Sequence, residues 1–273
     1  MNISFVWYFD KASSVFDNWR DGLRAAMKKI SKEHKVIWYL DKTMPDPGDS
    51  DFLLFWSSSN EDYFNQLDKY KERKGICLTT DPHNIDNLRK LDVVFCESDP
   101  IYEAVRSQGI RAIKAFGTDT DFFRPSFKVK KDIDFFYPAT FSPWKRQSEI
   151  AHLGHQLTCV GTVQPDGLAE LTECTRNGVN VINGYLPAKK ILNYYQRAKN
   201  VIIPAVHGSE RTVLEAMSCG IKPVVTHPEN VRTYSYIKEL EESKLEPRDF
   251  VVKNYSHIKY AEQLLKGISQ WFI

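Results

Sequence analysis

Short apolar runs alternate with amphipathic stretches along the whole chain. In the first half, apolar runs predict buried strands at 3–9, 35–40, 51–56, 75–80, 92–97 and 110–116. Apolar residues at helical spacing predict helices at 13–30, 60–73 and 99–109. Apolar strands that alternate with amphipathic helices are typical of a parallel sheet covered on both faces, so this half is expected to form a doubly wound α/β domain.

The second half repeats this pattern. Strands are predicted at 132–139, 156–161, 179–183, 200–206 and 221–226, and helices at 148–154, 167–178, 187–199, 210–220 and 256–272. The polar, turn-rich segment 117–132 lacks periodicity and is the expected joint. We therefore expect an α/β fold of two doubly wound, Rossmann-like domains, 1–120 and 121–273, that face each other across a cleft. The last helix, 256–272, is expected to be able to pack back towards the first domain.

Composition and charge restrict the partners. The 37 basic and 35 acidic residues give a net charge of only +2, so no global field demands nucleic acid or an anionic membrane. The five cysteines form no C-x-x-C pair, which argues against a disulfide framework and a zinc site and fits a reducing cytoplasm. The apolar run at the N-terminus is too short for a signal peptide or a membrane span.

The segment 207–220, HGSERTVLEAMSCG, follows an apolar strand and is the place where chemistry is expected. Ligands of doubly wound sheets bind at the carboxyl ends of the strands, and a helix N-terminus attracts phosphate. Gly208 lets the backbone approach a ligand, and the Glu215 carboxylate can accept two hydroxyl hydrogen bonds from a ribose diol. The segment is thus predicted to bind a nucleoside diphosphate. The alternative is that Glu210 only caps the helix and Glu215 is a solvated surface residue.

Four motifs in the same order resemble those of GT-B glycosyltransferases of the large retaining family four. They are GTDTDFFRP at 117–125, FSPWKR at 141–146, NGYLPAKKILNYYQRAKNVIIPA at 183–205 and LEAMSCG at 214–220. The resemblance covers residues 110 to 225 well and the rest by pattern only. It implies a GT-B fold and transfer of a hexose or pentose from a nucleotide-diphosphate sugar, with a UDP-sugar favoured and no cofactor required.

The resemblance also assigns roles to residues of the second domain. It implies that Lys145 binds the donor diphosphate with help from Arg146, and that Glu215 binds the ribose. It places the nucleobase pocket near Gly161 and residues 183–186. The expected donor-binding residues are Lys145, Arg146, Thr140, Gly161, Asn183, Tyr185, Leu186, Gly208, Ser209, Arg211, Thr212 and Glu215.

Two positions depart from the family pattern. The first acid of the family's Glu-x7-Glu element falls on His207, so the expected catalytic group beside the donor sugar is His207 or else Glu210. The family's arginine five residues before the lysine falls on Thr140, and Arg146 or Arg211 would have to supply the lost phosphate contact. These departures leave open a second reading, in which the chain binds a nucleotide sugar without turnover.

In the first domain, TTDPHNID at 79–86 is similar to a T-D-D-P-H stretch of related glycosyltransferase-like proteins. The similarity implies that His83 is a catalytic residue, with Asp81 as its neighbour or as a base on the acceptor side. The alternative is a helix-entry turn with His83 as the cap. Residues 10–14 are expected to line the acceptor side.

The expected acceptor is a surface glycan or a lipid-linked glycan. Arg20, Arg24, Lys28 and Lys32 recur every four residues on the first helix, with Lys29 and Lys35 beside them, so this stripe could contact acidic lipid headgroups at the membrane periphery. A DNA backbone would suit the same stripe, and the alternative function is a phage-type transferase that glycosylates hydroxymethylated bases in DNA. The acids at 119–121 belong to the linker motif, so metal-independent transfer is expected. The resemblance to the retaining family implies retention of configuration.

Overall fold

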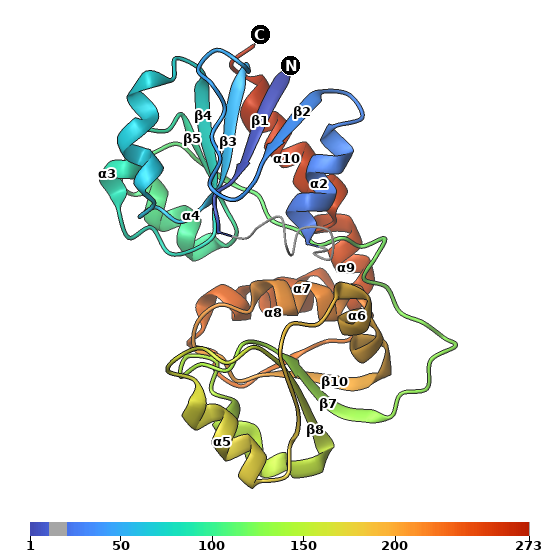
Figure 1. Ribbon diagram of the computed structural model, residues 1–273. Coiled ribbons are helices and arrows are strands. Elements are labelled where there is room, and N and C mark those ends of the chain that lie inside the picture. The colour runs from blue at the N-terminus through green and yellow to red at the C-terminus, as the bar shows by residue number, and fades with distance from the viewer. Residues whose placement is uncertain (11–20, 273) are drawn as a thin grey trace. The chain divides into compact units, whose positions relative to one another are not determined.

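The computed structural model describes residues 1–10 and 21–272, and the chain divides into two compact units. Unit 1 comprises Met1–Gly117 and His257–Ile273, and unit 2 comprises Thr118–Ser256. The joint lies before the expected boundary at residue 120, because the Thr118 N–H donates to the Tyr255 carbonyl at 2.8 Å inside unit 2. The last helix, α10 (His257–Ser269), is part of unit 1 (Figure 1).

Unit 1 is built on a six-stranded parallel sheet. Its strands are β1 (Asn2–Trp7), β2 (Lys35–Tyr39), β3 (Phe52–Ser57), β4 (Arg73–Leu78), β5 (Val93–Cys96) and β6 (Ala112–Lys114). Their order is β2-β1-β3-β4-β5-β6. Helix α2 (Gly22–Ile30) lies with α10 on one face, and η1 (Asp62–Lys69), α3 (Ile85–Leu88) and α4 (Asp99–Arg106) lie on the other (Figure 1).

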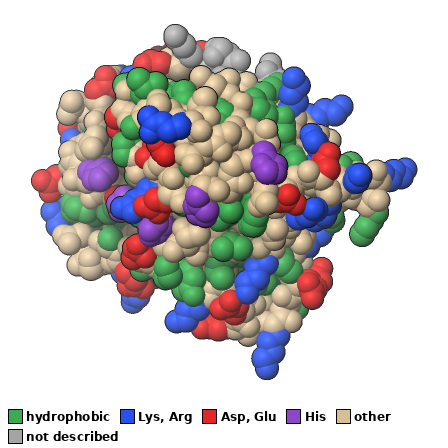
Figure 2. Space-filling model, turned by 90° about the horizontal axis from the view of Figure 1, so that it is seen from below, with side chains coloured by type: hydrophobic (Ala, Val, Ile, Leu, Met, Phe, Trp, Pro, Cys, Tyr) green, Lys and Arg blue, Asp and Glu red, His purple; other side chains and the backbone are tan. Residues whose placement is uncertain are grey.

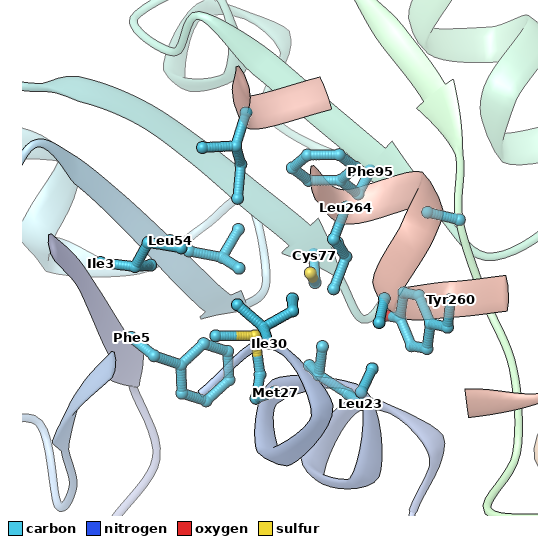
Figure 3. Close-up of a cluster of buried hydrophobic side chains, with 14 of the residues drawn as sticks. Ile3, Phe5, Leu23, Met27, Ile30, Leu54, Cys77, Phe95, Tyr260 and Leu264 are labelled. Atoms are coloured by element: carbon cyan, nitrogen blue, oxygen red, sulfur yellow. The ribbon is translucent and has the colours of Figure 1, made fainter. Parts of the chain in front are cut away.

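Each face of this sheet has its own apolar core. In Figure 3, Phe5 and Leu54 of the strands lie near Met27 of α2 and Leu264 of α10, and all four side chains are buried. Val6, the neighbour of Phe5, points to the opposite face and belongs to the second core. Burial on both faces explains why the strands are continuously apolar instead of alternating.

Helix α2 corrects the prediction of one exposed basic stripe. The helix begins at Gly22, after Asp21 accepts a hydrogen bond from the Arg24 N–H at 2.7 Å as the N-cap. Arg24 is only 6% exposed, because α2 packs against both the sheet and α10 and so buries a broad face. Helix α2 ends at Ile30, so Lys32 and Lys35 lie beyond it. Arg20 and the rest of the expected helix at 13–20 lie outside the described residues.

Unit 2 is built on a five-stranded parallel sheet in the order β11-β10-β7-β8-β9. Its strands are β7 (Ile133–Pro138), β8 (Leu157–Gly161), β9 (Asn180–Asn183), β10 (Ala198–Ile203) and β11 (Val224–Val225). Helices α6 (Ala188–Arg197), α7 (Glu210–Ser218) and α8 (Val231–Ser243) lie on one face, and α5 (Leu168–Arg176) lies with η2 (Gln147–Gln156) on the other (Figure 1). Helix α9 (Pro247–Asn254) packs against α7 and α8. The expected α/β class, with two parallel sheets, is confirmed.

Some elements differ from the pattern. The helices expected at 60–73 and 148–154 are the 3-10 helices η1 and η2, and η1 stops at Lys69 because the chain turns extended at Tyr70 before entering β4. The apolar pattern predicts no element at 227–255, where α8 and α9 form. The buried positions of α8 have helical spacing, but Thr233 among them is polar and the apolar Val231 is exposed, so the apolar residues alone do not mark the buried face.

The surface carries mixed charge. Figure 2 shows acidic and basic side chains interspersed over the face in view, with histidines between them. This mixture agrees with the small net charge. Within residues 1–10 and 21–272, no helix is both long and apolar enough to cross a membrane.

Candidate functional site

The strand order of unit 2 reverses between β7 and β10. From β7 the chain continues to β8 and β9 on one side, and β10 and β11 lie on the other side. Doubly wound sheets bind ligands outside the carboxyl ends of the strands, at the point where the strand order reverses. The two loops at this point are 139–146, which follows β7, and 204–209, which follows β10.

Lys145 connects these two loops. Its Nζ donates to the His207 carbonyl at 3.1 Å and to Ser209 Oγ at 3.0 Å. The backbones are also joined, because the Val206 N–H donates to the Trp144 carbonyl at 2.9 Å. The predicted diphosphate lysine therefore lies at the start of α7, next to the helix N-terminus.

Gly208 lies next to the Lys145 ammonium, and hydrogen bonds hold its backbone there. Its φ is +67°, and a Cβ added there would lie 3.0 Å from Lys145 Nζ. Its carbonyl accepts hydrogen bonds from Asn230 Nδ2 at 3.1 Å and from Thr233 Oγ1 at 2.5 Å. Ser209 also has a positive φ, of 82°, and precedes the first turn of α7. The first N–H groups of a helix have no partner inside the helix, so this end of α7 can bind an anion beside the lysine.

Glu215 lies one turn further along α7. Its side chain is 7% exposed, accepts a hydrogen bond from Tyr195 Oη at 3.0 Å, and lies 3.3 Å from Arg211 Nε. Burial raises the pKa of Tyr195, and the Glu215 charge raises it further, so the phenol stays protonated and donates. The alternative of a solvated Glu215 is therefore wrong.

Tyr185 is near enough to Arg211 for the guanidinium charge to affect its pKa. Burial raises the pKa of Tyr185, and the charge of Arg211 opposes that rise. The Tyr185 side chain remains 48% exposed on the loop after β9. The structure thus pairs Arg211 with Glu215 and places Tyr185 within reach of the Arg211 charge.

Glu210 has a structural partner. It is the first residue of α7, and its carboxylate forms an ion pair with the Arg232 guanidinium of α8. The side chains are only 6% and 12% exposed. The alternative in which Glu210 caps α7 is wrong, because Ser209 is the N-cap and the Glu210 carboxylate pairs with Arg232 instead. This ion pair favours a structural role for Glu210 over a catalytic one. The side chain of His207, the other catalytic candidate here, is exposed.

Three predicted residues shape the loop after β7. Arg146 has a φ of 50° and its Nη1 donates to Glu149 at 2.5 Å, so its guanidinium is held at η2. The Thr140 carbonyl accepts from Gln147 Nε2 at 2.8 Å. A Cβ on Gly161 would lie 2.0 Å from the Ala139 carbonyl oxygen, so only glycine lets the ends of β7 and β8 approach so closely.

The remaining predicted residues of unit 2 lie on neighbouring elements. Thr212 Oγ1 donates to the Pro138 carbonyl at 3.3 Å and ties α7 to the end of β7. Asn183 ends β9, and Leu186 follows it in the loop before α6. This loop is joined to β8, because the Gly184 N–H donates to the Gly161 carbonyl at 2.9 Å.

In unit 1, Asp81 and His83 follow the carboxyl end of β4. The His83 N–H donates to the Asp81 carbonyl at 2.8 Å, and the His83 side chain is exposed. The cap of α3 is Asn84, whose side chain accepts from the Asn87 N–H at 3.1 Å, so the alternative that made His83 the cap is wrong.

The strand order of unit 1 reverses between β1 and β3, and sequence reasoning missed the pair at that point. Tyr8 Oη donates to Asp62 Oδ1 at 2.7 Å, and Lys42 lies over the Tyr8 ring. Of the expected acceptor-side residues 10–14, only Asp10 is described, and it lies 3.6 Å from Lys42. Among the described residues, no cluster of three or more acids, histidines or cysteines could hold a metal ion.

Sequence reasoning also missed His227 and its partners. Its Nε2 lies 2.5 Å from Glu149 Oε2, and its Nδ1 lies 2.6 Å from Glu229 Oε1. Glu149 is the carboxylate that also holds Arg146. His227 and Glu149 are 78 positions apart in the sequence, and no local motif predicts such a contact.

No protein-family model and no curated protein matches this chain. Solved structures do. An E. coli trehalose-6-phosphate structure bound with UDP-2-fluoro glucose matches with a TM-score of 0.67 at 10% identity, over 99% of each chain. A candidate UDP-N-acetylglucosamine 2-epimerase from Listeria monocytogenes matches with a TM-score of 0.54 at 11% identity, over 99% of this chain and 96% of that one.

The pneumococcal O-GlcNAc transferase GtfA, in complex with UDP and GlcNAc, matches with a TM-score of 0.55 at 9% identity. The match covers 81% of this chain, which spans 57% of the length of GtfA. Likeness at such low identity reports architecture. Together with the two doubly wound parallel sheets, it shows that this chain has the GT-B fold of two Rossmann-like units.

Proposed function

We propose that the protein is a glycosyltransferase that moves a sugar from a nucleoside diphosphate sugar to an acceptor hydroxyl. The observation that carries the proposal is the Lys145 ammonium, held by the His207 carbonyl and Ser209 Oγ at the N-terminus of α7. A cation and a helix N-terminus at the carboxyl ends of β7 and β10 suit the diphosphate that leaves during transfer.

The donor in this proposal is a UDP-sugar, carrying a hexose or a pentose. Uridine diphosphate is part of the ligand or substrate named for each of the three similar structures. Lys145 and α7 neutralise the leaving diphosphate without a metal ion. Tyr185, Arg211 and Glu215 bind the nucleoside part, and the side chain of His207 lies beside the sugar.

Unit 1 binds the acceptor, with Asp81 and His83 as the groups that act on its hydroxyl. The acceptor is a surface glycan or a lipid-linked glycan, and transfer proceeds with retention of configuration. Residues that face a neutral glycan need hydrogen-bonding capacity more than charge, and the small net charge of +2 fits this better than the polyanion DNA. The proposed transfer takes place in the cytoplasm, and at the periphery of a membrane when the acceptor is a lipid-linked glycan.

A thermal-shift panel tests the donor site. UDP, GDP, ADP, CMP, dTDP and their common sugars are each added to the protein. A ligand that binds only the folded state stabilises it by about 2.7 kcal/mol at 100 times its Kd. We expect a shift with UDP, and its loss in Lys145→Ala. The matched control is Lys222→Ala, which removes an exposed lysine paired with Glu241.

Product analysis separates transfer from its rivals. Incubation with the UDP-sugar that binds and with candidate glycan acceptors should yield UDP and a longer glycan. A bound donor that stays intact over hours would make the protein a binder, and a UDP-sugar of changed stereochemistry would make it an epimerase. If no nucleotide shifts the melting temperature, the proposed donor site is wrong.

A further inference from the structure

The imidazole of His227 lies between two carboxylates. It belongs to the loop between β11 and α8 and is 18% exposed. Each ring nitrogen has a carboxylate oxygen within 2.6 Å, Glu149 on one side and Glu229 on the other. A neutral imidazole has a single N–H and would turn a lone pair towards one of these oxygens. The geometry therefore fits the imidazolium, which donates to both.

The charges around His227 come from two elements. Glu149, and Arg146 bound to it, face the ring from η2, and Glu229 faces it from its own loop. His152 of η2 and His227 line one cavity. Hydrogen bonds to Glu149 and then to Glu229 raise the pKa of His227 above its usual value. Burial opposes the lowering of the Glu149 pKa, but the contacts with His227 and Arg146 outweigh it, and a backbone hydrogen bond and then His227 lower the pKa of Glu229.

His227 also connects the two loops that meet at Lys145. On one side, Glu149 holds Arg146, the residue after Lys145. On the other side, the Asn230 N–H donates to the His227 carbonyl at 3.0 Å, and Asn230 Nδ2 donates to the Ala205 and Gly208 carbonyls. A path of hydrogen bonds thus runs from η2 through His227 to the start of α7.

We propose that His227 is a positioning residue whose imidazolium clamps the loop after β7 to the loop before α7, so that nucleoside diphosphate binds tightly only while His227 is protonated. Loss of the proton leaves a ring nitrogen facing a carboxylate and two carboxylates without their shared cation. The loop at 226–230 is then released from η2, and Gly208 loses its fixed place. The inference rests on the proposed donor site.

The direction of the pH effect follows from the raised pKa. A group whose folded pKa lies above the usual value stabilises fully below about pH 6.5, and the contribution is lost as the pH rises through the raised pKa. One linked proton changes affinity by at most tenfold per pH unit. Between pH 7 and 9, the affinity for UDP is therefore expected to fall, by up to about a hundredfold.

The test uses the full chain and UDP as the probe. Calorimetry measures the UDP affinity at pH 7 and 9, where the phosphates of UDP stay ionised, in the wild type, His227→Gln and His152→Gln. We expect the wild type and His152→Gln to lose UDP affinity between pH 7 and 9, by up to about a hundredfold. His227→Gln should bind weakly at both pH values. In Glu149→Gln the midpoint of the pH profile should fall, because a carboxylate that raises the pKa of His227 is gone.

A second readout needs no nucleotide. In an NMR titration, the amide signals of Gly208 and Ser209 should follow the same midpoint as the His227 ring signals, and they should not titrate in His227→Gln. Amides that ignore His227, or a UDP affinity with the same pH dependence in wild type and His227→Gln, overturn the clamp. Failure of the donor site looks different, because UDP then binds at neither pH while the amides still titrate.

Discussion

Replacing Glu210 by alanine tests whether this acid stabilises unit 2 or is a catalytic group beside the donor sugar. The carboxylate forms an ion pair with Arg232, and the side chains are 6% and 12% exposed. Alanine removes this carboxylate from the buried Arg232 charge. Removing one partner of a buried pair typically costs about 3–5 kcal/mol, much more than the net worth of the pair.

The chain offers a matched control. Glu241 is paired with Lys222 at 2.7 Å, but these side chains are 53% and 50% exposed. Exposed pairs contribute about 0–1 kcal/mol, because water screens the charges. Glu241→Ala should therefore leave the free energy of unfolding nearly unchanged.

Urea unfolding followed by circular dichroism measures the difference. With a slope of about 2–3 kcal/mol per molar urea, a loss of about 3 kcal/mol lowers the midpoint by about 1–1.5 M. Hydrogen exchange should show the loss of protection in unit 2, to which Glu210 and Arg232 belong. If the urea midpoint of Glu210→Ala falls no further than that of Glu241→Ala, the buried ion pair does not stabilise unit 2. A catalytic role for Glu210 would then be the better interpretation.

Three further predictions follow from contacts of the described residues. Gly208→Ala should weaken UDP binding at least about tenfold, because the new Cβ meets the Lys145 ammonium, and charge-assisted hydrogen bonds contribute about 1.5–3 kcal/mol. Gly178→Ala, with a similar positive φ and open space around it, is the control for backbone strain, and equal binding losses would contradict the steric reason. Tyr195→Phe should lower the free energy of unfolding by about 1–3 kcal/mol in a urea titration, because the buried Glu215 loses a donor, and Tyr194→Phe should lower it less. All five cysteines are buried, so Ellman's reagent should modify them slowly in the native protein and modify five thiols after unfolding in guanidinium; rapid native labelling would contradict the packing.

The sequence was sufficient to predict the elements whose stability comes from strong periodicity. Continuous apolar runs such as that of β3 can only be buried on both faces, and this property fixed the parallel sheets. The helix after β10 was also predictable, since Gly208 and the run before it specify a strand, a turn and a helix start. Helix α8 was not, because it is polar over most of its length and is stabilised by contacts with α7 and α9.

Side-chain partners were harder to predict than elements. The buried state of Arg24 and Glu210 depends on which helix lies beside them, and periodicity within one helix does not report that. His227 and Glu149 are brought together by the order of the strands, 78 residues apart. Contacts of this kind arise from the topology of the sheet, so they become visible only when the whole unit is folded.

The histidine at position 207 is compatible with the proposed diphosphate site, because the hydrogen bond from Lys145 goes to the backbone of this residue. Lys145 bonds the His207 carbonyl, which any residue would offer, and Gly208 is held through its own carbonyl by α8 and the loop before it. The exposed His207 side chain is therefore able to vary while the cation and the helix N-terminus stay in place. A carboxylate at this position would repel the developing charge of a leaving diphosphate, whereas an imidazole can donate a hydrogen bond to it or to a sugar hydroxyl. Under the proposed function, a histidine where the resembling family has an acid is thus expected to change the contact with the sugar more than the binding of the nucleotide.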